Sequence, residues 1–100
     1  MYQVIFSLSV KGNIISFYVY IVRCSDDTLY TGITTELKRR IEEHNSSLKG
    51  AKYTRVRRPV CLVYKEVCKD RSSASKREYA IKKLSRAKKL ALIESLVTTL

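Results

Sequence analysis

Several features that assign proteins to familiar classes are missing from this 100-residue chain. No apolar run approaches the ~18 residues that a membrane-spanning helix needs. The N-terminal stretch lacks the positively charged start and the small-residue cleavage site of a signal peptide. No segment is repeated or of low complexity. With 45% hydrophobic and 29% charged residues, the composition predicts one folded, soluble domain with no membrane partner.

Residues that commonly hold metals or form disulfides are also scarce. The chain has one histidine, and its three cysteines, Cys24, Cys61 and Cys68, show no C-x-x-C spacing. These numbers argue against a zinc site or a disulfide framework. Cys61 and Cys68 sit in or beside apolar segments, where reduced cysteine packs as a small core residue. We therefore expect a reducing, cytoplasmic location.

Acidic residues are few, nine against twenty Lys and Arg, and the formal net charge is +11. Residues 1–50 carry six basic and five acidic side chains, whereas residues 51–100 carry fourteen and four. A basic surface can simply keep a protein in solution. The uneven distribution nevertheless favours a polyanionic partner that faces the second half of the chain.

The hydrophobic pattern predicts three strands. Residues 15–23 are β-branched and aromatic, with alternate side chains on opposite faces. Ser25, Asp26 and Asp27 have turn chemistry, and residues 28–33 give a second strand, so a hairpin is the simplest connection. A third strand is predicted at residues 60–66, after Pro59.

A helix is predicted between the second and third strands. Thr35 is expected to cap it, and it extends from Glu36 to about Ser47. Its predicted buried stripe contains Leu37, Ile41 and Leu48. At 100° per residue, His44 falls within this stripe and Arg40 on its edge.

The C-terminal part of the chain reads as two helices. One begins near Ser72 and carries Glu78 on its apolar face, and the other is capped by Ser85. The sum is an α+β domain in which a three-stranded antiparallel sheet is packed with helices. The domain is predicted at residues 17–97, after an N-terminal extension of residues 1–16.

A group of polar residues recurs at a distinctive spacing. Tyr18-Val19-Tyr20 precedes Tyr30-Thr31-Gly32 by ten residues, and Arg40, His44 and Glu78 follow. Together these residues resemble the motifs of the GIY-YIG nuclease family, in particular its small stand-alone members, from about Phe17 to Leu96. The resemblance implies a GIY-YIG endonuclease-like fold and hydrolysis of phosphodiester bonds in DNA with Mg²⁺ or Mn²⁺.

The resemblance also implies a role for each residue: Tyr20 as the base that takes a proton from water, Tyr30 as its support, Arg40 as a phosphate clamp, His44 as a contact to the leaving oxygen or a phosphate, and Glu78 as the metal ligand. A phenol with a pKa near 10 is a weak base at neutral pH, so positive charge from Arg40 or a metal is expected to favour the phenolate. A single carboxylate with retained waters suits Mg²⁺.

Each of these residues also has a purely structural explanation. The tyrosines and His44 fit a half-buried surface, and Arg40 could pair with Glu36 or Glu43 on its helix. Ser75 and Glu78 have the spacing of a capping box, which leaves a second explanation for this glutamate.

Gly32 likewise has two explanations. It is a strand-end or bulge glycine, or its missing Cβ lets backbone and phosphate approach closely.

A basic segment lies between the predicted helix and the third strand. Its candidate nucleic-acid contacts are Lys49, Lys52, Tyr53, Arg55, Arg57 and Arg58. The cations can follow phosphates and the tyrosine can stack on a base, which predicts salt-sensitive binding without sequence preference. Any selectivity is then for DNA shape, or is supplied by a partner protein, and the oligomeric state is left open.

A non-catalytic nucleic-acid-binding module on the same scaffold is the alternative function. Tyr18 stands where the family has its first glycine, Thr31 replaces an isoleucine, and no asparagine follows Glu78. A nuclease loses cleavage and keeps binding when Glu78 is replaced, whereas a binding module shows no difference.

Overall fold

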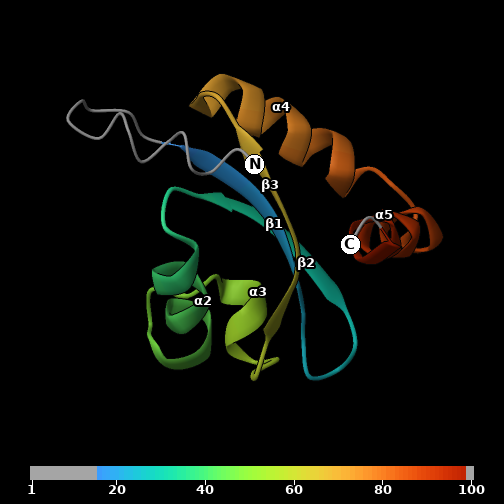
Figure 1. Cartoon of the computed structure of the whole chain (residues 1–100). Helices are drawn as coiled ribbons and strands as arrows, with labels where there is room; N and C mark the ends of the chain where they lie inside the picture. Colours follow the sequence, from blue (N-terminus) through green and yellow to red (C-terminus); the bar gives the residue numbers. More distant parts are fainter. Residues whose placement is uncertain (1–15, 99–100) are drawn as a thin grey trace.

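The computed structural model describes residues 16–98 of the chain, and its centre is a three-stranded sheet (Figure 1). The strands are β1 (Phe17–Arg23), β2 (Leu29–Thr34) and β3 (Cys61–Cys68), and both neighbours pair with β1 in antiparallel fashion. The order β2-β1-β3 makes β1 the central strand. All three predicted strands are therefore confirmed, and the predicted extension, Ser16 apart, lies outside the described residues.

Two pairs of helices cover opposite faces of this sheet (Figure 1). Helices α2 (Leu37–Ser46) and α3 (Lys52–Arg55) lie between β2 and β3 in the sequence, and α4 (Arg71–Lys82) and α5 (Arg86–Thr98) follow β3. The predicted α+β architecture is confirmed. The short helix α3 was predicted as part of a loop, because four residues are too few to show a helical period.

Strand β1 contributes to the core on both faces. Val19 and Ile21 pack with Ala74 and Ile81 of α4, whereas Tyr20 and Val22 face α2. All four β1 side chains are buried, as alternation on a central strand covered on both sides requires. The sheet thus separates two small cores, and Tyr20 belongs to the one on the α2 side.

The hairpin between β1 and β2 confirms the predicted turn. Asp27 has a φ of 71°, a left-handed conformation that aspartate tolerates better than most residues. The Asp26 carboxylate accepts hydrogen bonds from the backbone N–H and the hydroxyl of Thr28, at 3.1 and 2.6 Å. Local side-chain hydrogen bonds therefore determine where the chain reverses.

The predicted ends of the helix after β2 need correction. Thr35 does not cap it: Glu36 occupies the N-cap position without a side-chain cap, and its N–H donates to the hydroxyl of Thr34. The helix ends at Ser46, before another turn could bring Leu48 to the core, and Leu48 is 84% exposed.

The ends of the later helices also differ in part from the prediction. Helix α4 starts one residue before Ser72, and the carboxylate of Asp70 caps it by accepting from the N–H of Ser73 at 2.7 Å. Glu78 therefore lies two turns into the helix, so the capping box with Ser75 is excluded. The predicted cap of α5 is confirmed, since the Ser85 hydroxyl accepts from the N–H of Lys88.

The cysteine packing was predicted incorrectly for one residue. Cys61 is exposed at the start of β3, and Cys68 is partly buried at its end, whereas Cys24 lies in the core on the α2 side. The cause is that β3 is one of the two outer strands of the sheet, so apolar residues on it need not face a covering helix.

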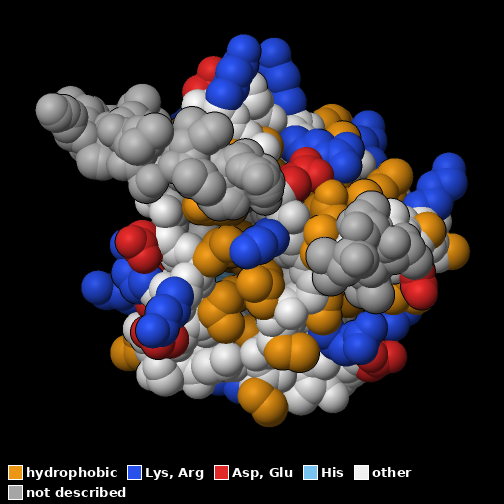
Figure 2. All heavy atoms as spheres, viewed as in Figure 1, with side chains coloured by type: hydrophobic (Ala, Val, Ile, Leu, Met, Phe, Trp, Pro, Cys, Tyr) orange, Lys and Arg blue, Asp and Glu red, His pale blue; other side chains and the backbone are white. Residues whose placement is uncertain are grey.

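One face of the molecule carries an apolar surface over β3. Figure 2 shows hydrophobic side chains gathered there, with Lys and Arg around them. Leu62 and Val67 are 38% and 40% exposed, and Lys65 between them is also exposed. Among the described residues, no helix is long and apolar enough to cross a membrane.

The start of β3 is attached to α2 by one side chain. The side-chain N–H of Asn45 donates to the carbonyl of Val60 at 3.0 Å, and the side-chain oxygen of Asn45 accepts from the N–H of Val60 at 2.7 Å. Val60 is only 4% exposed, so its backbone groups have little access to replacement partners in water.

We therefore expect Asn45→Ala to lower the free energy of unfolding by about 1–3 kcal/mol, because two buried backbone groups lose their partner. Denaturant unfolding measures this change. The control is Ser46→Ala on the exposed side of the same helix, which should alter stability little. An Asn45→Ala protein as stable as Ser46→Ala would contradict the assignment.

Candidate active site

The phenol ring of Tyr20 lies over Gly32, its partner on β2. A Cβ built at Gly32 would be 2.5 Å from the Tyr20 hydroxyl and 2.8 Å from Cζ. The glycine is inside β2 and its φ is not positive, so neither a strand end nor backbone strain explains it. Its missing side chain instead makes room for the phenol, which reaches across to the outer strand.

The Tyr20 hydroxyl is hydrogen-bonded to His44 of α2, with 2.7 Å between Oη and Nε2. On the other side of the imidazole, Nδ1 lies 2.8 Å from the hydroxyl of Thr54, which itself donates to the carbonyl of Ala51 at 2.9 Å. Because the single proton of Thr54 is used on that carbonyl, its oxygen accepts from Nδ1–H. Nε2 then carries the lone pair and accepts from Tyr20.

Burial determines the protonation of this chain. His44 is 0% exposed, and burial, together with the positive charge of Arg40, lowers its pKa from 6.5 to about 4. Burial raises the pKa of Tyr20 to about 12, while the hydrogen bond and charge of Arg40 act in the opposite direction. At neutral pH both groups are therefore uncharged, and positive charge from Arg40 alone does not produce a phenolate.

Two tyrosine rings contact the imidazole, and a third stacks behind one of them. Tyr20 and Tyr30 meet His44 edge to face, with centroids 5.8 and 5.5 Å away, and Tyr53 stacks on Tyr30 at 5.9 Å. The guanidinium of Arg57 lies 3.9 Å from the centroid of the Tyr53 ring. Tyr30 thus contacts His44 directly. The ring of Tyr53 already has two partners, the ring of Tyr30 and the guanidinium of Arg57.

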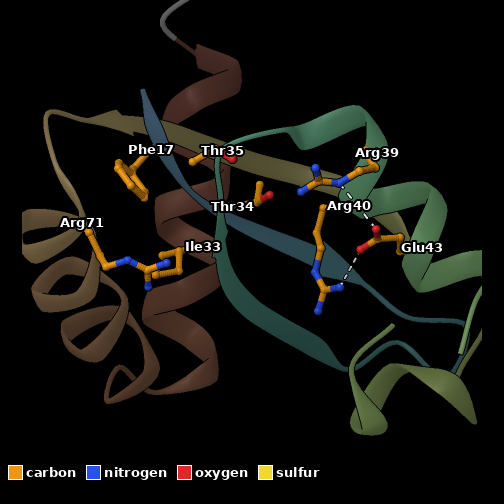
Figure 3. Close-up of a pocket in the computed structure, with 8 residues that line it drawn as sticks. All are labelled: Phe17, Ile33, Thr34, Thr35, Arg39, Arg40, Glu43 and Arg71. Carbon is orange, nitrogen blue, oxygen red and sulfur yellow. Dashed lines mark hydrogen bonds and ion pairs between the residues drawn. The ribbon is translucent and has the colours of Figure 1, made fainter. Parts of the chain in front are cut away.

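Arg40 lies between the imidazole region and a surface hollow. Its guanidinium donates to the Glu43 carboxylate and to the carbonyl of Lys49, both at 2.8 Å, and Figure 3 shows it beside Glu43 and directed away from Thr34. The predicted pairing with Glu43 exists, yet the side chain stays 23% exposed and also acts on Tyr20. Because these contacts fix the orientation of the planar guanidinium, it can offer N–H donors to an anion without a further change of side-chain conformation.

Glu78 lies on α4, the helix on the other face of the sheet. Its carboxylate forms an ion pair with Lys82 at 3.2 Å, and its negative charge contributes to the raised pKa of Tyr20. The part of the chain that the structure describes contains no cluster of three His, Cys, Asp or Glu side chains. A lone, 23% exposed carboxylate fits a hard cation such as Mg²⁺, which takes its remaining ligands from water and substrate phosphates.

The five cations among the six predicted nucleic-acid contacts fall into two groups. Lys49, Lys52 and Arg55 are exposed on and beside α3. Arg57 instead pairs with Asp26 and donates to the carbonyl of Tyr53. Arg58 donates to the carbonyls of His44, Glu43 and Ser47 at the end of α2, so this side chain caps a helix.

Sequence reasoning missed two residues that support the imidazole. Thr54 is 0% exposed and sets the tautomer of His44, but a threonine inside a basic segment gives no sign of this role. Gly50 is buried against α2, where a Cβ would be 2.7 Å from the carbonyl oxygen of Glu43 and 2.9 Å from Cα of His44. Its position after the predicted helix could have indicated a close approach of two backbones.

Comparison with known families identifies the class of protein. The profile of the GIY-YIG catalytic domain matches residues 16–91, which is well over half of the chain. The protein therefore belongs to the GIY-YIG family, which supports a nuclease-type function in general terms.

More particular similarity is to proteins named UPF0213. The UPF0213 protein DP2720 of Desulfotalea psychrophila is 66% identical over 80 residues, covering 80% of this chain and 73% of that protein. The UPF0213 protein SH2523 of Staphylococcus haemolyticus is 57% identical over 77 residues, covering 77% and 93%.

Two solved structures share the fold. The solution NMR structure of EF2693 from E. faecalis has a TM-score of 0.59 and 42% identity, covering 86% of this chain and 91% of that one. The solution NMR structure of the UPF0213 protein BH0048 from Bacillus halodurans has a TM-score of 0.52 and 46% identity, covering 80% and 84%.

The contact between Gly32 and Tyr20 leads to a prediction. Gly32→Ala should lower the free energy of unfolding by about 1–3 kcal/mol, because the added methyl group overlaps the phenol and displaces it from His44. In a Tyr20→Leu background, where the overlapping atoms are gone, the same substitution should cost much less. Denaturant unfolding of the four proteins measures the coupling. Equal costs in both backgrounds would show that Gly32 has another purpose.

The pKa of His44 predicts a pH dependence. His44 is the chain's single histidine, so an NMR titration of its ring protons should show one transition, near pH 4. Because the unfolded state binds the proton more readily, stability should fall by up to about 3 kcal/mol as pH decreases from 6.5 to 4. His44→Gln, measured at the same pH values, should lack this component. A ring that titrates near pH 6.5 would contradict the buried, neutral state.

Proposed function

We propose that this protein is a divalent-metal-dependent endonuclease that hydrolyses phosphodiester bonds in DNA. The observation that supports it best is the buried chain from Tyr20 through His44 to Thr54, held beside the guanidinium of Arg40. A buried phenol needs a hydrogen-bond partner for stability alone. A partner held in one tautomer by a third residue, beside a guanidinium, is in addition the arrangement that general base catalysis uses.

In the proposed reaction, Tyr20 relays a proton. Its hydroxyl donates to Nε2 of His44 and accepts from Arg40, which leaves one lone pair to accept a proton from the attacking water. As the water proton moves to Oη, the phenol proton moves to Nε2, and the hydroxide forms a bond to phosphorus. The bond to the leaving oxygen breaks, and this oxygen takes a proton from solvent. Tyr20 thereby acts as a base although its pKa is raised to about 12.

Binding of the phosphate makes this transfer easier. The charge of Arg40 is one cause of the lowered pKa of His44, and a phosphate bound to Arg40 offsets that charge. The same guanidinium stabilises the negative charge that develops at phosphorus. His44 acts in this scheme as the acceptor for Tyr20, since a fully buried imidazole has no access to a phosphate or a leaving oxygen.

In this proposal, Glu78 is the protein ligand of the metal. A Mg²⁺ or Mn²⁺ ion held by this carboxylate would supply Lewis-acid stabilisation of the phosphate and leaving oxygen. Tyr30, in contact with the imidazole, keeps the ring of His44 oriented and limits water around it.

The proposed substrate preference is for DNA structure. Lys49, Lys52 and Arg55 are exposed cations that suit phosphates, and phosphate contacts orient a strand without reading its bases. A branched, nicked or single-stranded DNA is therefore the expected substrate.

A nucleic-acid-binding module without turnover is the second candidate. The raised pKa of Tyr20 and its exposure of 1% favour it, because the phenol at rest is neither ionised nor in contact with water. The two candidates differ in one observable, metal-dependent cleavage.

The test measures cleavage of supercoiled, branched and single-stranded DNA in Mg²⁺ and in EDTA. Tyr20→Phe and Glu78→Gln should each reduce the cleavage rate by about 100-fold or more while DNA affinity changes little, since both groups act on the reaction rather than on binding. Glu42→Gln, an exposed carboxylate on α2, is the matched control and should cleave like wild type. All proteins are purified identically.

Two results would contradict the nuclease proposal. Wild type that binds DNA and never cleaves it supports the binding module. Cleavage that survives both Tyr20→Phe and Glu78→Gln shows either a contaminating nuclease or a site elsewhere in the molecule.

A further inference from the structure

A hollow of about 300 Å³ opens beside Arg40, at the end of β2. Figure 3 shows Arg39, Arg40 and Glu43 on one side of it and Phe17 and Arg71 on the other, with Thr34 and Thr35 between them. Three guanidinium groups face one carboxylate, so the hollow is cationic. Its volume is at the lower end of those that hold small ligands.

Arg71 stands out among these residues because its position in α4 is electrostatically unfavourable for the helix. It is the first residue of α4, where the positive end of the helix dipole disfavours a cation. It is exposed, and no ion pair joins it to another described residue. Within residues 16–98 its one ring contact is with Phe17, whose centroid lies 5.6 Å from the guanidinium carbon.

The opposite wall has a different charge balance. Glu43 pairs with Arg40 at 2.8 Å and with Arg39 at 3.4 Å, so one carboxylate is shared between two guanidinium groups. An anion entering the hollow therefore meets a partly neutralised pair on one side and the unneutralised Arg71 on the other. Phe17 of β1, beneath the Arg71 guanidinium, adds an apolar ring surface.

We propose that this hollow is a nucleotide subsite that binds the nucleotide next to the scissile phosphate, with its phosphate on Arg71 and its base against Phe17. The subsite rests on the proposed function, because Arg40 is the residue that joins it to Tyr20. An aromatic ring beside a cation is the combination with which proteins hold single strands. The subsite therefore favours substrates in which one strand is unpaired at the cleavage point.

The test measures affinity for a short fluorescein-labelled single-stranded oligodeoxynucleotide in EDTA, where no metal-dependent cleavage takes place. Arg71→Ala should weaken binding about tenfold, since a charge-assisted contact to phosphate is lost. It should also reduce the slope of log K against log salt by about 0.7, the value for one phosphate on a single strand. Lys88→Ala removes the same charge from the exposed surface of α5 and is the matched control, with an expected change below about twofold.

Two further measurements separate the subsite from bulk charge. Arg71→Lys should recover only part of the affinity, because an ammonium lacks the planar contact with the ring of Phe17. On a single-stranded cleavage substrate, Arg71→Ala should raise KM and leave kcat within about twofold, as expected for an interaction present in both ground and transition states.

The outcomes for the subsite and for catalysis can be told apart. Equal effects of Arg71→Ala and Lys88→Ala on oligonucleotide affinity would overturn the subsite even if the wild type cleaves DNA, and so would wild type that fails to bind the oligonucleotide. A selective loss with Arg71→Ala in a protein that never cleaves would keep the subsite and refute the nuclease.

Discussion

The candidate site depends on one hydrogen bond, between the hydroxyl of Tyr20 and Nε2 of His44 inside the core on the α2 side. Two polar groups buried this completely must satisfy each other, since an unpaired neutral donor or acceptor would cost about 1–3 kcal/mol. Much of the local architecture serves this requirement: Thr54 fixes the tautomer, Gly32 makes room for the phenol, and Gly50 lets the following chain approach α2.

The sheet explains how residues from its two faces act on one atom. Arg40 and His44 belong to α2, and Glu78 belongs to α4 on the opposite face, yet all three influence Tyr20. The phenol of Tyr20 lies at β2, an outer strand of the sheet, because it extends from the central strand β1 across Gly32 of β2. A site at a sheet edge is open to a long polymer in a way that a site under the middle of the sheet is not.

Sequence reasoning predicted the strands, the α+β class and the inward position of His44, because these depend on periodicity and on residue types with strong preferences. It placed the cap of the helix after β2 incorrectly, since Thr34 and Thr35 both carry a hydroxyl suited to the role and only the folded backbone decides between them. It could not show that Arg58 caps α2, because that pairing joins residues distant in sequence. Composition alone cannot separate such an internal cation from the exposed Arg55.

Helix α3 has two sides with different partners, although it is only one turn long. Thr54 faces inward and holds the imidazole, whereas Lys52 and Arg55 face solvent. In the proposed function, a polyanion binds the outer side of α3 and the inner side aligns the proton acceptor. Both therefore depend on the same few backbone dihedrals. If the proposed function holds, a polyanion that favours one setting of α3 also biases the orientation of His44, so binding and the alignment of the proton acceptor are thermodynamically linked through this turn.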